Sequence, residues 1–130
     1  MEFFIAKKLK GGSFETLDEK IREELKKEGF GVITEIDIKK TLKEKIDVDF
    51  RNYKILGACN PSFAHKALQA VDKIGTLLPC NVVIQESPDG GLEVMAFDPA
   101  SAMMELDNPE LAKLSIEVRE SLIKVLDSLD

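Results

Sequence analysis

The sequence is poor in histidine, cysteine and tryptophan. Its 130 residues include no tryptophan, one histidine and two cysteines. The cysteines do not form a Cys-x-x-Cys pair, so the spacings of thioredoxin-type exchange and of zinc ribbons are absent. Serine nucleophile elbows, Walker loops, GxGxxG and HExxH are also missing. The sequence therefore contains no recognisable catalytic constellation, and it leaves any cofactor unknown.

Long apolar runs and an excess of positive charge are absent too. No apolar run approaches the roughly 18 residues that a membrane span needs. The start, MEFFIAKKLKGG, has an acid at position 2 and too short an apolar stretch for a secretory signal. The 18 basic and 24 acidic residues give a net charge of −6, which repels phosphate backbones and anionic lipid. We therefore expect a cytoplasmic protein, with neither nucleic acid nor a membrane as its partner.

The chain does have enough apolar material for one compact domain, which we expect to span residues 1–130. Hydrophobic residues make up 44% of the chain, and its length is close to the commonest size of a single domain. Such a chain can bury a core without disulfides or a structural metal. In the cytosol both cysteines are reduced by default, which disfavours a structural disulfide.

The N-terminal part of the chain predicts a strand followed by a helix. The run at residues 2–9 is short and apolar and ends before two glycines, as a first strand does. In the helix that follows, Thr16 and Glu19 have capping-box spacing, and Gly29 supplies the left-handed stop. The apolar face of this helix consists of Leu17, Ile21 and Leu25.

Residues 30–59 predict two strands with a short helix between them. In residues 30–38 the even positions are apolar apart from Thr34, a period of two that indicates a strand with one buried face. Residues 39–46 have the spacing of a short helix. A second strand is expected at residues 53–59, where Gly57 indicates a bulge or a close approach of another backbone.

The C-terminal half predicts two further helices and a β-hairpin. Asn60 and Pro61 start a helix that we expect to run to residue 74, because the Asn side chain caps free amides and Pro suits the first helical position. Residues 80–86 and 92–97 are apolar runs joined by SPDGG, which predicts a hairpin. A short stretch with Met103 and Met104 follows, and the final helix starts at Asn108-Pro109. Its apolar stripe consists of Leu111, Leu114, Val118, Leu122, Val125 and Leu129.

The boundaries of these elements contain the candidate site. Cys59 comes just before the cap of a predicted helix, and Cys80 opens a predicted strand. Free amides and the dipole at a helix start favour negative charge, so this position can lower the pKa of a nearby thiol or bind an anionic group. Against this, free cysteine usually behaves as a small buried apolar residue. The candidate ligand-binding residues are Cys59, Asn60, Pro61, Ser62, Pro79 and Cys80.

The only histidine invites comparison with a metal site. Cys59, His65 and Cys80 would give three ligands and leave an open position. However, His65 falls on the polar side of its helix with Gln69 and Asp72, opposite the face that packs. A surface histidine is therefore the favoured interpretation, and we assign no metal ligands.

Several motifs in order resemble one known family. YKILGACNP at residues 53–61 is followed by LLPCNVVI at 77–84, a glycine hairpin and MAFDP at 95–99. This series resembles the bacterial and archaeal family called domain of unknown function 302, over about residues 14–129. The resemblance implies an α+β fold similar to that of the TATA-binding protein, without implying DNA binding. We then expect a curved antiparallel sheet of about five strands, with two long helices packed on one face.

The expected sheet decides whether the candidate residues meet. If strands 53–59 and 80–86 are antiparallel neighbours, the end of one lies beside the start of the other, and Cys59, Asn60, Pro79 and Cys80 converge. A parallel crossover would place the two cysteines at opposite ends of the sheet. We expect convergence.

Three functions remain open at this point. The leading hypothesis is a small binding module whose groove at the Cys59 and Cys80 edge takes a small molecule or an anion, or presents a reactive thiol. The alternative is a structural or interaction protein that forms a homodimer through its sheet or its C-terminal helix, with the cysteines as core packing. An enzyme comes third, because the sequence lacks a recognisable nucleophile and base.

Overall fold

Five antiparallel strands in the order β1-β5-β4-β3-β2 form the sheet of this protein. The structure is a computed structural model that describes residues 2–103 and 106–129. The strands are β1 Phe4–Leu9, β2 Gly31–Asp37, β3 Tyr53–Cys59, β4 Cys80–Glu86 and β5 Leu92–Phe97. The helices are α1 Phe14–Lys27, α2 Ile38–Ile46, α3 Pro61–Ala70, α4 Pro99–Met103 and α5 Pro109–Asp127, with a 3₁₀ helix η1 at Asp72–Leu77.

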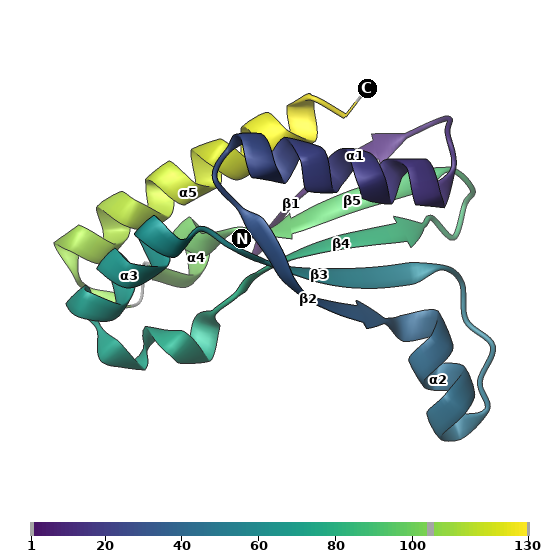
Figure 1. Ribbon diagram of the computed structural model, residues 1–130, viewed down its shortest axis with the longest axis horizontal. Helices are drawn as coiled ribbons and strands as arrows, with labels where there is room; N and C mark the ends of the chain where they lie inside the picture. Colours follow the sequence, from purple (N-terminus) through teal and green to yellow (C-terminus); the bar gives the residue numbers. More distant parts are fainter. Residues whose placement is uncertain (1, 104–105, 130) are drawn as a thin grey trace.

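The two long helices, α1 and α5, lie together on one side of the sheet (Figure 1). Between them and the sheet is the main core, which contains Ile21 and Leu25 of α1, Leu122 of α5, and Leu56 and Val82 of the strands. All five of these side chains are fully buried. The predicted α+β class, with a five-stranded antiparallel sheet and two long helices on one face, is therefore confirmed.

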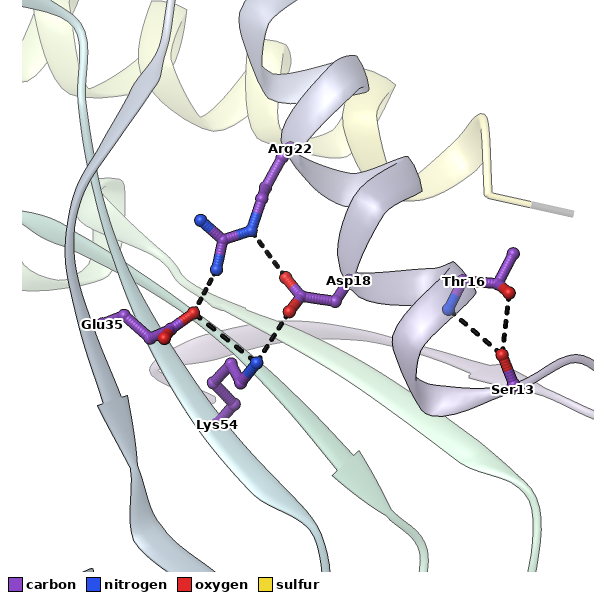
Figure 2. Close-up of polar contacts among 6 residues, drawn as sticks. All are labelled: Ser13, Thr16, Asp18, Arg22, Glu35 and Lys54. Atoms are coloured by element: carbon purple, nitrogen blue, oxygen red, sulfur yellow. Dashed lines mark hydrogen bonds and ion pairs between the residues drawn. The ribbon is translucent and has the colours of Figure 1, made fainter. Parts of the chain in front are cut away.

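Helix α1 begins at a different cap from the one predicted. The Ser13 Oγ accepts a hydrogen bond from the Thr16 amide at 3.1 Å, so Ser13 is the N-cap and Thr16 lies within the first turn (Figure 2). The prediction placed the cap one turn too late because both residues carry a suitable hydroxyl group. The stop at Gly29 is confirmed: its φ is +85°, and the Phe30 amide reaches back to the Leu25 carbonyl.

The prediction that the even positions of residues 30–38 share one buried face is wrong. The register between β2 and β3 shifts between Val32 and Thr34, so Ile33 is an extra, bulged residue. A bulge of one residue reverses the alternation, because side chains change faces every residue. Val32 therefore packs on the core, whereas Ile36 lies on the opposite face and is 46% exposed.

The helix expected at residues 61–74 is shorter than predicted. Helix α3 ends at Ala70, because Val71 is extended with a φ of −144° and a ψ of 108°. The 3₁₀ helix η1 then carries Ile74 back into a second, smaller core cluster with Ala67 and Leu111. The apolar spacing correctly indicates burial, but it spans two helical segments.

The remaining elements lie close to where the sequence places them, although β1 begins at Phe4 rather than at residue 2 and α2 begins one residue earlier than predicted. Strands β3, β4 and β5 have the predicted bounds, and β4 and β5 form the predicted hairpin. The Asn108 Oδ1 caps α5 by accepting from the Leu111 amide at 3.0 Å. Met103 is buried in α4, and Met104 lies outside the described residues. Within the described parts of the chain, no helix is long and apolar enough to cross a bilayer.

Candidate functional site

The two cysteines meet at one edge of the sheet. Strands β3 and β4 are antiparallel, and Ala58 at the end of β3 is paired with Cys80 at the start of β4. Cys59 follows Ala58 directly, so both thiols lie at the same end of neighbouring strands. The predicted convergence is confirmed, and the parallel crossover is excluded.

A cavity of about 290 Å³ opens at this edge, between the sheet and helices α3, α4 and α5. Its wall includes four of the six candidate residues: Cys59, Asn60, Pro79 and Cys80. The other residues of the wall come from all along the chain: Phe30, Ile33, Ala58, Phe63, Ala64, Ala67, Leu78, Pro99, Met103, Leu111, Leu114, Ser115 and Val118. The site is thus an apolar chamber with two thiols in its wall.

Small side chains explain why this space is not filled. Ala58 on the sheet faces the cavity, and so do Ala64 and Ala67 on α3. Protein interiors are normally packed to crystal-like density, so a cavity of this size requires small side chains in its wall. The three alanines on β3 and α3 are too small to fill the space between these elements.

The polar side chains in the wall are already engaged within the protein. The Asn60 Oδ1 accepts from the Phe63 amide at 3.3 Å, and its Nδ2 donates to the Glu28 carbonyl at 3.4 Å. The Ser115 Oγ donates to the Ala112 carbonyl at 2.7 Å. The cavity therefore offers a ligand mainly apolar contact, together with two thiols.

Both thiols are free and half-buried. Burial, reinforced by the proximity of Cys59, raises the pKa of the Cys80 thiol to about 11. The expectation that the helix start lowers the pKa of a nearby thiol is therefore wrong for Cys80, because burial and the neighbouring Cys59 both disfavour the thiolate. At neutral pH this side chain is a neutral thiol, and the thiolate is the nucleophilic form.

Pro61 and Ser62 lie outside the cavity wall and are exposed at the start of α3. Pro61 has no amide hydrogen, and the Phe63 amide is taken by the Asn60 side chain. The Ala64 amide donates to the Asn60 carbonyl at 2.9 Å. The first turn of α3 is therefore largely satisfied internally, which leaves few donors for an anion.

His65 is exposed on α3 and does not contribute to the wall of the cavity. In the described residues, no group of three or more His, Cys, Asp or Glu side chains is placed to hold a metal ion. Cys59 and Cys80 are thus brought together without the histidine.

Sequence reasoning missed the helical half of the cavity wall. The apolar stripe of α5 has two roles: Leu111, Leu114 and Val118 face the cavity, whereas Leu122 and Val125 pack on the sheet. Periodicity identifies the apolar stripe, but it does not show which of its residues pack on the sheet and which line the cavity. The cavity could have been inferred from the alanines of α3, because such small side chains leave space between a helix and its neighbours.

Comparison with known proteins agrees with the fold and the motifs. The family model described as Domain of unknown function DUF302 matches residues 5–129. A crystal structure of an uncharacterized conserved protein DUF302 from Bacillus stearothermophilus is similar, with a TM-score of 0.89 and 27% identity over 98% of each chain. No curated protein matches the chain. The resemblance found in the sequence is confirmed, and the chain belongs to the family Domain of unknown function DUF302.

Proposed function

We propose that the protein is a binding module for a small, largely apolar molecule held in the cavity beside Cys59 and Cys80. The observation that carries the proposal is the cavity itself, with about 290 Å³ of space and almost entirely apolar walls. Ligand sites are typically concave and mostly apolar, with a few polar groups that orient the ligand. In this chain the groups able to orient a ligand are the two thiols.

The chemistry of the wall favours an apolar ligand over an anion. Among the described residues of the wall there is no Lys, Arg or His side chain to pair with a negative group. The amides at the start of α3 are mostly engaged, and the Asn60 side chain is used as their cap. An anion in this chamber would lose its hydration without gaining a partner, which is costly.

Binding is also better supported than catalysis by a thiol. The raised pKa of Cys80 keeps this group protonated at neutral pH, so it is a weak nucleophile. The described wall contains no carboxylate or imidazole to act as its general base. We therefore assign the thiols to the surface that contacts the ligand.

Native mass spectrometry of protein purified without reductant or chelator tests the proposal. We expect a native mass above the 14.5 kDa of the chain, or above a multiple of it, and loss of the excess on denaturation. The variant Ala64→Leu fills the cavity and should remove the excess mass. Ala70→Leu is the matched control, because Ala70 is on the same helix but is not in the wall, and it should retain the ligand.

A thermal-shift assay tests the same site when the natural ligand is lost in purification. Indole, a neutral aromatic probe, should raise the unfolding midpoint of the wild type and of Ala70→Leu, but not of Ala64→Leu, because a ligand stabilises the state that binds it. Benzoate, an anion of similar size, should have a smaller effect. A bare native mass together with no effect of indole on the wild type contradicts the proposal.

A further inference from the structure

The face of the sheet opposite α1 and α5 carries an apolar row that crosses all five strands. Register places Ile36 opposite Ile55, Ile55 opposite Val83, Val83 opposite Met95, and Met95 opposite Ala6. Directly opposed residues share a face, so these side chains form one continuous stripe. None of them lies in the cavity wall, so this surface is separate from the proposed ligand site.

This row is less covered than the other face of the sheet: Ala6 and Ile36 are exposed, and Ile55, Val83 and Met95 are only partly buried. Helices α1 and α5 both lie on one side of the sheet (Figure 1). Among the described residues, the members of the row belong to neither core cluster, and Ile36 is 46% exposed. A second apolar pair, Phe4 opposite Phe97, extends the surface at the β1 edge. An apolar, aromatic and methionine-containing face without charge in its centre has the composition of an interface core.

A row of polar side chains borders this apolar row and carries charges of both signs, with Lys8 on β1 opposite Glu93 on β5. The Gln85 side chain on β4 is at its centre: it accepts from Arg51 Nε at 3.0 Å and donates to Glu93 Oε1 at 2.8 Å. Basic Arg51 therefore lies on the β3 side of β4, and acidic Glu93 lies on the β5 side. A two-fold axis running along β4 would bring Glu93 of one copy opposite Arg51 of the other, twice. The Arg51 and Glu93 positions are thus complementary to each other across the axis, as an isologous contact requires.

The size of the face is sufficient for a specific dimer. Five strands about 4.8 Å apart and three rows about 6.8 Å apart span roughly 24 by 20 Å. Two such faces in contact would bury about 1,000 Å², roughly the least area that a biological interface buries. Two sheets that pack face to face in this way are about 10 Å apart, with side chains interdigitating between them.

We propose that a second copy of this chain packs on the open face of the sheet, sheet against sheet, about a two-fold axis along β4. The apolar row supplies the buried centre of the contact, and the Arg51 and Glu93 side chains set its register. Val83 lies on the axis and therefore faces its own counterpart.

Sedimentation over a range of protein concentrations tests this dimer. We expect the wild type to have twice the 14.5 kDa mass of the chain at micromolar concentration. In Val83→Lys, two ammonium groups would face each other in an apolar contact, and we expect the dissociation constant to rise about 100-fold or more. Met95→Lys is a second variant of the same face, and circular dichroism verifies that each variant is folded.

The matched control is Ile116→Lys on α5. Ile116 is an apolar side chain that is 52% exposed on the other layer of the protein, so the same substitution there should leave the dimer intact. A wild type that stays monomeric, a dimer that survives both Val83→Lys and Met95→Lys, or a dimer that only Ile116→Lys dissociates would each overturn the proposal. The last result would assign the contact to the C-terminal helix instead.

Discussion

The Nζ of Lys54 on β3 lies 2.7 Å from the Oδ2 of Asp18 on α1 (Figure 2). The Oδ1 of Asp18 accepts from Arg22 Nε, also at 2.7 Å, and Glu35 on β2 pairs with both Arg22 and Lys54. Glu35 reaches this face of the sheet because of the bulge at Ile33, which reverses the alternation of β2. The bulge therefore exposes Ile36 on one face and supplies a carboxylate to the other.

Removing the Lys54 charge should destabilise the fold. Asp18 retains only 13% of its side-chain exposure, so Lys54→Met leaves a mostly buried carboxylate with one partner fewer. We expect the free energy of unfolding to fall by about 1.5–3 kcal/mol, the usual range for a hydrogen bond to a charged group. Denaturant titration measures the change. In the control Lys8→Met, which breaks an exposed 3.5 Å pair with Asp89, the loss should be much smaller, because solvent screens an exposed ion pair.

The contribution of Asp18 should disappear in acid. Burial opposes its ionisation, but hydrogen bonds and charge from Arg22 and Lys54 outweigh burial and hold the pKa below the ordinary value of 3.8. Because the pKa is lower in the folded state, the stabilisation is complete above the unfolded value and is lost as the pH falls through the folded value. The difference in unfolding free energy between wild type and Asp18→Asn should therefore be constant at neutral pH and shrink below about pH 4. A difference that does not depend on pH would mean that the carboxylate charge contributes nothing.

Gly57 on β3 should not tolerate a side chain. A Cβ at this position would overlap the Thr34 Oγ1 on β2 and lie 2.8 Å from the Pro79 Cγ. Gly57→Ala should therefore cost about 1–3 kcal/mol in unfolding free energy, as overpacking does. Gly31→Ala on β2 is the control, because nothing lies within 4 Å of its added Cβ. Adding Thr34→Ala to Gly57→Ala should restore part of the loss; equal stability of the two glycine variants would contradict the close approach.

The sequence predicted most of the elements because their ends carry local signals. Prolines and asparagines start α3 and α5, glycine ends α1, and the SPDGG turn defines the β4–β5 hairpin. Such signals depend on residues only a few positions apart, so they can be recognised without knowing the fold. At Gly57 the sequence predicted a bulge or a close approach of another backbone; the structure has a bulge in the neighbouring strand β2, and the atoms closest to Gly57 belong to the Thr34 and Pro79 side chains. Glycine weakens a strand, so its presence in one usually marks a bulge or a close contact.

The bulge and the cavity could not be predicted in the same way. The bulge at Ile33 depends on the register between β2 and β3, which a period-two pattern cannot reveal. The cavity depends on small residues from β3 and α3 facing one part of α5, so it exists only after tertiary packing. Sequence reasoning placed Cys59 and Cys80 together but could not show that the space beside them is apolar and unfilled.

The Cys80 thiol should react slowly at neutral pH and faster only in strong base. Its pKa is raised from 9.0 to about 11, chiefly by burial and then by Cys59. In Cys59→Ala the second cause is removed and burial remains, so the rate of alkylation of Cys80 by iodoacetamide should rise with pH with a midpoint that stays above 9. The thiolate is the reacting form, so this rate follows the ionised fraction. The same variant unfolded in urea supplies the control, with a midpoint near the ordinary value. A folded midpoint at or below the unfolded one would mean that the thiol is solvated, and would favour thiol chemistry over ligand contact at this site.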